Sequence, residues 1–220
     1  MNVVWEQEWD KIYKDQGEVQ FGILPTVVVA AELFEKNRCE TIMDLGCGTG
    51  RHSIYLASKG FHVIATDVSE TAVEHTRAKA VELGLANMEF KQHDMRNIPY
   101  EDNSLDAVLC VWTTGHGNLE DTRQTTNEIY RVLKSGGMVV IDYVSTEDTN
   151  YGKGEELEKD TFINNVEGEE NIPHHYSSKE ELEDLYIEFT SKEMSEIEYK
   201  FEDSYGNEHI IKAFVLVGVK

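Results

Sequence analysis

The chain has 220 residues, a length at which a single domain can bury a substantial core. It carries 42 Asp and Glu residues against 20 Lys and Arg residues, and the resulting formal net charge of -22 would repel phosphate backbones and anionic membrane surfaces. We therefore expect neither a nucleic-acid nor a membrane partner.

The first predicted elements are two helices. Apolar residues at helical spacing (Trp5, Trp9, Ile12 and Tyr13) indicate an amphipathic N-terminal helix, and a second helix is expected over about 25–36. From residue 41 the chain alternates between strands and helices. We expect strands at 41–46, 61–67, 88–94, 105–112 and 137–144, and helices at about 51–59, 69–83 and 119–134. Such alternation predicts a Rossmann-like, doubly wound α/β fold with helices on both faces of a parallel sheet.

The pattern changes after residue 145. Residues 146–171 are acidic and show little apolar periodicity, so we expect a long irregular excursion that carries one short helix. A helix over 178–189 follows, and the alternating stretches 192–201 and 208–219 are joined by the turn-like sequence EDSYGN. These stretches predict a C-terminal antiparallel hairpin that completes a seven-stranded, mostly parallel sheet.

The sequence contains no recognisable signal for export or for a disulfide framework. The first residues, MNVVWEQEWD, are acidic where a secretory signal is basic, and the apolar run ILPTVVVAAELF is too short to span a bilayer. Cys39, Cys47 and Cys110 lack the C-x-x-C spacing of a zinc site. We therefore expect a cytoplasmic protein.

A glycine-rich turn follows the first predicted strand in MDLGCGTGRHS, residues 43–53. Glycines at 46, 48 and 50 permit a tight turn on which a ligand can lie directly against the backbone, and the next helix offers free N–H groups. The dinucleotide fingerprint requires glycine at position 51, where this chain has Arg51, and a P-loop is absent as well. Asp67, at the end of the second strand, can accept hydrogen bonds from both hydroxyls of a ribose.

The segments MDLGCGTGRHS, ATDVS, QHDM and EIYRVLKSGGMVVID resemble those of class I S-adenosylmethionine-dependent methyltransferases over about residues 40–144. The resemblance implies S-adenosylmethionine as cofactor and S-adenosylhomocysteine as product. It places the methionyl part on Asp44 and the Gly46–Gly50 turn, and the ribose on Asp67. Val68 would pack on the adenine, and Asp94 with the Met95 backbone would meet the adenine amine. The candidate cofactor-binding residues are Asp44, Gly46, Cys47, Gly48, Gly50, Arg51, Asp67, Val68, Asp94, Met95, Val111 and Trp112.

Three residues are candidates for catalysis. Tyr13 offers an aromatic face to a sulfonium cation, although its helical spacing equally fits a packing stripe. His116, after the fourth core strand, and His174, in a histidine pair with His175, are candidates to deprotonate a thiol, phenol or amine. An ordinary loop histidine remains an alternative for each. The pair also raises the possibility of metal binding, but the spacing supplies no third ligand, so we predict no metal site.

The resemblance implies an enzyme, a methyltransferase that acts by in-line displacement on a small-molecule thiol, hydroxyl or amine. WDKIY resembles the N-terminal lid of the tellurite-resistance and thiopurine types. One domain over 1–220 is expected: a helical lid at 1–36, a cofactor-binding core at 37–145, an acidic lid or insertion at 146–177, and a closing helix and hairpin at 178–220. A catalytically silent cofactor-binding scaffold or sensor and a protein or tRNA methyltransferase remain alternatives, and an NAD-dependent oxidoreductase fits least. The acceptor and the oligomeric state stay open.

Overall fold

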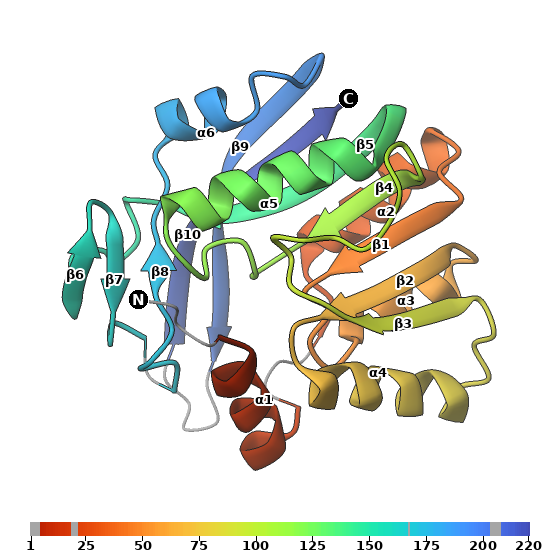
Figure 1. Cartoon of the computed structure of the whole chain (residues 1–220), viewed down its shortest axis with the longest axis horizontal. Coiled ribbons are helices and arrows are strands. Elements are labelled where there is room, and N and C mark those ends of the chain that lie inside the picture. The colour runs from red at the N-terminus through yellow and green to blue at the C-terminus, as the bar shows by residue number, and fades with distance from the viewer. Residues whose placement is uncertain (1–4, 19–21, 167, 203–207) are drawn as a thin grey trace.

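A seven-stranded sheet forms the centre of the molecule, in the order β3-β2-β1-β4-β5-β10-β9 (Figure 1). The computed structural model describes residues 5–18, 22–166, 168–202 and 208–220. The parallel strands are β1 (Thr41–Leu45), β2 (His62–Asp67), β3 (Met88–Gln92), β4 (Leu105–Cys110) and β5 (Leu133–Val144). β10 (Glu208–Val219) pairs antiparallel with β5 and with β9 (Ser191–Glu202). The predicted doubly wound sheet and C-terminal hairpin are confirmed, while the turn at 203–207 lies outside the described residues.

Two apolar layers cover the sheet because side chains alternate between the faces of a strand. Ile42 of β1 faces α2 (Pro25–Lys36) and α3 (Arg51–Ser58), whereas its neighbour Met43 faces α5 (Leu119–Val132) and α6 (Lys179–Leu185). α4 (Glu70–Glu82) packs against β2 and β3, and Ser69 caps it by accepting from the Ala72 N–H. Among the described helices none has the length and apolar character that a bilayer crossing requires.

The strand order reverses beside β1. β1 pairs with β2 on one side and with β4 on the other, so the chain leaves the carboxyl ends of β1 and β4 toward opposite directions. In an open parallel sheet the resulting crevice is where ligands bind. The glycine turn after β1 and the loop after β4 both lie at this edge.

The prediction for residues 146–171 is wrong in its one specific element. The described residues of this segment contain no helix; instead β6 (Glu155–Glu158), β7 (Thr161–Ile163) and β8 (His174–His175) form a separate three-stranded sheet. The rings of Tyr151, Phe162 and Tyr176 pack edge to face with centroids 5.3 to 5.9 Å apart and supply its local core. Strands of two to four residues are too short to show periodicity in a sequence.

The small sheet is attached to the main body through backbone hydrogen bonds. His175 N–H donates to the Gly115 carbonyl at 2.8 Å, and Gly117 N–H donates to the Pro173 carbonyl at 2.8 Å. Because both contacts involve the loop after β4, the small sheet stands beside the crevice at the carboxyl end of the parallel strands.

Candidate active site

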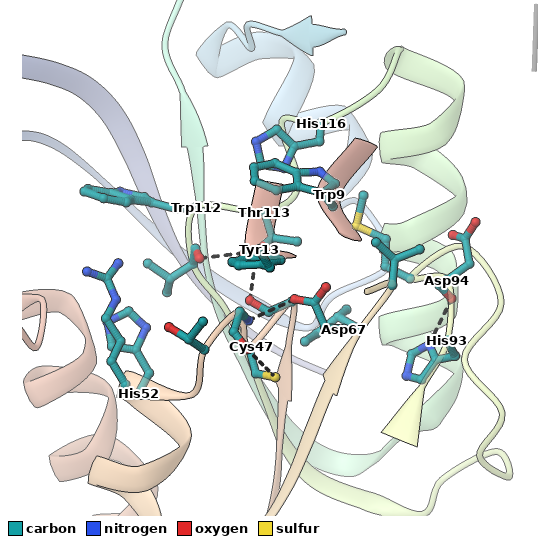
Figure 2. A pocket seen from close by; sticks show the side chains of 18 residues that line it. Trp9, Tyr13, Cys47, His52, Asp67, His93, Asp94, Trp112, Thr113 and His116 are labelled. Carbon is teal, nitrogen blue, oxygen red and sulfur yellow. Dashed lines mark hydrogen bonds between the residues drawn. The ribbon is translucent and has the colours of Figure 1, made fainter. Parts of the chain in front are cut away.

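A cavity with about 850 Å³ of empty space, its open mouth included, lies at the crevice (Figure 2). It is lined by Trp9, Tyr13, Leu45, Gly46, Cys47, Gly48, Thr49, Arg51, His52, Asp67, Val68, His93, Asp94, Met95, Val111, Trp112, Thr113 and His116. Most of the predicted cofactor residues line this cavity, whereas Asp44 and Gly50 do not.

The floor of the cavity is the glycine turn. The N–H groups of Gly46 and Cys47 both donate to the Thr66 carbonyl at 2.8 Å, which closes the turn onto β2. Gly46 and Gly50 have φ of 77° and 85°, in the region that glycine adopts without strain. A Cβ at Gly46 would lie 2.3 Å from the Thr113 side chain, and one at Gly50 would lie 2.5 Å from Thr76. Both positions therefore require glycine for conformation and for space.

Asp67 presents a carboxylate at the end of β2. Its Oδ2 accepts the Gly48 N–H and its Oδ1 accepts the Ser69 N–H, both at 2.9 Å. Each oxygen keeps a further lone pair for a ligand. Burial raises the pKa of Asp67 to about 6, although these backbone hydrogen bonds oppose the shift. A 7% exposed carboxylate on a cavity wall is suited to two hydroxyl donors.

Asp44 lies beneath the cavity wall, where it supports the start of α3. Its Oδ2 accepts the Ser53 hydroxyl at 2.5 Å, and burial raises its pKa to about 6. Asp44 does not line the cavity, and its side chain is bonded to Ser53 in the helix that follows the turn, so a contact between Asp44 and the methionyl group stays a prediction. Gly50, which begins that helix in a left-handed conformation, packs against α4 instead.

Trp112 is held in place by the C-terminal half of the sheet. Its φ is 59°, and its N–H donates to Asp142 Oδ1 at 2.7 Å. Tyr199 of β9 donates to Asp142 Oδ2 at 2.8 Å and packs edge to face on the Trp112 ring, with centroids 5.3 Å apart. The Arg51 guanidinium lies over the indole, 5.1 Å from the ring centroid. The sequence did not identify Asp142 and Tyr199 as site residues. They meet through strand pairing across β5, β10 and β9, and no local sequence motif marks that pairing.

Helix α1 (Trp5–Gln16) lies over the glycine turn and forms the wall of the cavity that faces this turn. Tyr13 is 9% exposed, and its hydroxyl is 3.0 Å from the position that a Cβ of Gly48 would take. Burial and the nearby Asp67 hold the pKa of Tyr13 well above its usual range, so the phenol is neutral. Its ring stacks on Trp9 at 5.8 Å, and Trp9 in turn packs on His116 at 4.7 Å. The side chain of Trp5 lies outside the described residues.

One side chain fixes α1 to α4. Asp10 Oδ1 accepts the Ser69 hydroxyl at 2.8 Å and the Thr71 N–H at 3.0 Å, at the N-terminus of α4. Burial opposes ionisation, but these bonds together with Lys14 hold the pKa of Asp10 below its usual range. An ionised carboxylate at a helix N-terminus is stabilising, so this contact holds the helix over the cavity.

The far end of the cavity is formed by the segment after β3. Val68, Asp94 and Met95 line the wall as predicted, and Arg96 donates to both oxygens of Asp94, from Nε at 2.9 and 3.1 Å. His93 was not predicted; its Nδ1 lies 2.9 Å from the Asp94 carbonyl, and its buried Nε2 has no hydrogen-bond partner. His52 has the same kind of buried Nε2, and burial lowers its pKa to about 3. No sequence signal distinguished these two histidines from ordinary core residues.

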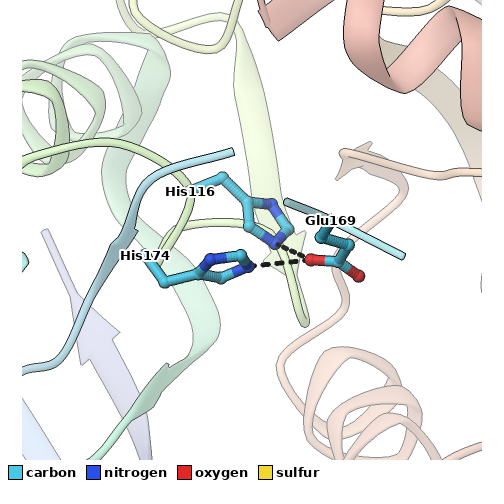
Figure 3. Close-up of side chains that lie close together, drawn as sticks. All are labelled: His116, Glu169 and His174. Carbon is cyan, nitrogen blue, oxygen red and sulfur yellow. Dashed lines mark hydrogen bonds and ion pairs between the residues drawn. The ribbon is translucent and has the colours of Figure 1, made fainter. Parts of the chain in front are cut away.

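The structure separates the two adjacent histidines and joins one of them to His116 (Figure 3). His174 Nε2 lies 2.8 Å from Glu169 Oε2, and His116 Nε2 lies 3.7 Å from the same oxygen. His175 points away, with its Nδ1 2.8 Å from the Thr161 hydroxyl and its Nε2 2.9 Å from Glu181. Burial lowers the pKa of His116 to about 4 despite the opposing charge of Glu169, so its ring is neutral at pH 7. Spacing in the sequence gave no reason to select Glu169.

Comparison with known proteins agrees with this geometry. Residues 42–137 match the model of a family described as a methyltransferase domain. The demethylmenaquinone methyltransferase of Clavibacter sepedonicus is 40% identical over 107 residues, which are 49% of this chain and 42% of that protein. The putative methyltransferase YqeM of Bacillus subtilis is 37% identical over 120 residues, which are 54% of this chain and 47% of that protein. The chain thus spans about half the length of the curated relatives it matches.

Two solved structures share the fold. A SAM-dependent methyltransferase from Methanosarcina mazei aligns with a TM-score of 0.71 at 22% identity, over 90% of this chain and 99% of that one. TehB from Haemophilus influenzae aligns with a TM-score of 0.67 at 21% identity, over 97% of this chain and 67% of that one. At these identities the likeness establishes the fold, including the hairpin that ends the sheet.

Proposed function

We propose that this chain, whose residues 42–137 match the model of a methyltransferase domain, is a class I S-adenosylmethionine-dependent methyltransferase that acts on a small-molecule nucleophile. The observation that carries the proposal is the pairing of a bare glycine turn with the Asp67 carboxylate inside one cavity. When bound, S-adenosylmethionine supplies an electrophilic methyl group and leaves as S-adenosylhomocysteine. The chain's own task is to hold the two reactants in line and to exclude water.

The cavity residues fit the parts of this cofactor. Asp67 has lone pairs left for the two ribose hydroxyls after accepting two backbone N–H groups. Val68, Asp94 and Met95 line the end that would hold the adenine, and the glycine turn with Arg51 would hold the methionyl group. Tyr13 and Trp112 line the cavity with aromatic rings, and such rings attract a sulfonium cation.

The enclosure of the cavity supports a small acceptor. α1 covers the glycine turn, and the sheet formed by β6, β7 and β8 is hydrogen-bonded to the loop after β4. Trp9 and His116 form the wall that remains for an acceptor. The neutral His116 ring offers a nitrogen lone pair to the acceptor's proton or to a metal ion. The relatives named as demethylmenaquinone methyltransferases also favour a small molecule over a macromolecule.

The remaining parts of the proposal concern location and partners. The three cysteines are free and buried, which supports a reducing compartment such as the cytoplasm. The net charge of -22 supports the expectation that neither nucleic acid nor an anionic membrane surface is a partner. We also propose that the lid, the core, the insertion and the closing hairpin are parts of one domain.

Transfer of a labelled methyl group tests the reaction and the acceptor class together. Methyl-labelled S-adenosylmethionine is incubated with pooled thiols, phenols, hydroquinones and amines, and separately with tRNA and with cellular protein. We expect label in the small-molecule pool only. Label in tRNA or protein would contradict the small-molecule class, whereas intact cofactor binding without transfer to any pool would favour a silent scaffold.

His116 is expected to act on the acceptor rather than on the cofactor. The change His116→Asn should therefore slow transfer by at least about tenfold. This is less than the rate factor of about 100 to 10,000 that a positioned acid–base group typically contributes. Cofactor affinity should stay within about twofold in calorimetry, since the side chain lies on the Trp9 side of the cavity. His62→Gln, at an exposed histidine on β2, is the control. Equal rates in the His116 variant and the control would remove His116 from the reaction.

A further inference from the structure

His116, Glu169 and His174 come from three separate parts of the chain and meet at the edge of the cavity (Figure 3). Their ligand atoms all lie within 4.8 Å of one another. Both histidines aim Nε2 at the same carboxylate oxygen, from 2.8 and 3.7 Å. A histidine–carboxylate hydrogen bond needs only one histidine. The second ring nitrogen, which faces the same ionised oxygen, is therefore not explained by such a bond.

We propose that these three side chains bind a divalent transition-metal ion of the zinc class at the acceptor end of the cavity. Zn–N and Zn–O distances near 2.0–2.1 Å in a tetrahedral site place neighbouring ligand atoms roughly 3.3 Å apart. The two separations from Glu169 Oε2, 2.8 and 3.7 Å, bracket that value. The third separation, between the two histidine ligand atoms, is within 4.8 Å, so shifts of the side chains alone would complete the coordination.

The backbone already holds the ligands in position. His116 and His174 form an antiparallel bridge, and the bonds from Gly117 to Pro173 and from His175 to Gly115 flank it. His174 and His175 point to opposite sides because they are neighbours on a strand, so β8 directs one histidine at the cluster and the other at Glu181. The Trp9 ring packs on His116 and shields the cluster from solvent on that side.

The ligand set selects the kind of ion and leaves room for a substrate. Two imidazoles and one carboxylate suit zinc, iron, cobalt or manganese, and three protein ligands leave an open position, as in catalytic rather than structural zinc sites. His116 lines the cavity, so the open position is beside the space for the acceptor. This arrangement fits a hydroxyl or thiol acceptor, because a bound cation lowers the pKa of the group it coordinates.

The role in the reaction rests on the proposed function. With the ion bound, His116 is a ligand and not the base, so the acceptor loses its proton to solvent on coordination, and its lone pair forms the new bond to the methyl carbon. The carbon–sulfur bond breaks, and its electron pair returns to sulfur as a neutral thioether. No oxidant or reductant is needed, so any redox-inert divalent ion of suitable size would serve.

Metal titration of the full chain tests the site without using activity. Tag-free protein, freed of metal by a chelator, is titrated with Zn²⁺ in a calorimeter and with Co²⁺ in a visible spectrometer. We expect one Zn²⁺ per chain and the visible d–d absorption of Co²⁺ held by nitrogen and oxygen ligands. Glu169→Gln and His174→Ala should each weaken Zn²⁺ binding at least about tenfold, since loss of an outer-shell partner alone costs that much.

A matched control is available on β2. His62 and Glu89 form an exposed histidine–carboxylate pair at 3.0 Å, so His62→Gln removes a pair of the same kind and should leave Zn²⁺ binding unchanged. Absence of Zn²⁺ binding by the wild-type chain, or equal affinity in Glu169→Gln, would overturn the site. S-adenosylmethionine is titrated into the same metal-free samples: its binding without Zn²⁺ binding contradicts the metal site alone, and the reverse result contradicts the proposed function alone.

Discussion

Asp67 combines burial with an ionisable group, and this combination has a cost in stability. Burial raises its pKa to about 6, as it does for Asp44 and Asp142. The ordinary pKa of an aspartate is about 3.9, so the folded chain binds more protons than the unfolded chain between about pH 4 and 6. The free energy of unfolding that these groups contribute is therefore highest below pH 4 and is lost as the pH rises through 6. The site keeps charges that weaken the fold at neutral pH.

Cofactor affinity should depend on the ionisation of Asp67. Ribose hydroxyls donate to the ionised carboxylate, so with a pKa of about 6 we expect S-adenosylhomocysteine to bind roughly tenfold more weakly at pH 5 than at pH 7.5. Calorimetry at both values measures the change. Asp67→Asn, which is neutral throughout, should bind weakly at both. If that variant kept the pH dependence, Asp44 or Asp142 would be its source, and a flat wild-type profile would contradict the role given to Asp67.

At the scale of single residues, the sequence revealed those positions that lie in local motifs. The glycine turn and Asp67 follow directly from strand ends, and a strand end has a known place in a parallel sheet. His52 and His93 lie within the segments MDLGCGTGRHS and QHDM, but the motif gives neither of them a role, and Glu169 contacts His116 through tertiary folding alone. Such contacts join residues far apart in the chain, which periodicity does not encode.

Among the elements, the glycine turn tolerates little change. Gly50 and Gly60 both have positive φ, but a Cβ at Gly60 would meet nothing within 4 Å, whereas one at Gly50 would lie 2.5 Å from Thr76. Gly60→Ala should cost about 1 kcal/mol from the backbone alone. Gly50→Ala should cost at least about 2–3 kcal/mol because a steric clash is added. Urea denaturation compares the two, and equal costs would show that the close approach to α4 is not tight.

Helix α1 should control how fast the cofactor leaves. Asp10→Ala removes its two hydrogen bonds to the start of α4, which are worth about 1–2 kcal/mol. We expect S-adenosylhomocysteine to dissociate roughly 5 to 30 times faster, because each 1.4 kcal/mol is a factor of ten. Stopped-flow tryptophan fluorescence measures the rate. Asp15→Ala removes an exposed charge of the same helix and serves as the control; equal rates in the two variants would show that α1 does not cover the bound cofactor.

Longer elements were predictable and shorter ones were not. α1, α2 and the five parallel strands follow from apolar spacing over five or more residues. β6, β7 and β8 were not predicted, because their packing depends on three aromatic residues that turns bring together. The same short strands position His174. The wrongly predicted helix in residues 146–171 and the unpredicted contact of His174 with Glu169 therefore have the same cause.

At the scale of the whole molecule, topology explains why the predicted residues converge. The ends of β1, β2 and β4 meet at the crevice beside β1. Asp142 of β5 and Tyr199 of the C-terminal hairpin hold Trp112 in position there. The N-terminal helix lines the crevice, and the small sheet is hydrogen-bonded to the loop after β4 beside it. In the proposed function, the core would bind the nucleoside and these two additions would define the acceptor.

The most direct test is calorimetric titration of S-adenosylmethionine, S-adenosylhomocysteine and NAD into the wild-type chain and into Asp67→Ala. Loss of the carboxylate leaves two buried ribose hydroxyls without acceptors and should cost on the order of 2 to 4 kcal/mol. We therefore expect micromolar binding of the first two ligands, none of NAD, and affinity lost in the variant. Unchanged affinity in Asp67→Ala, or a preference for NAD, would contradict the assignment of this cavity to S-adenosylmethionine.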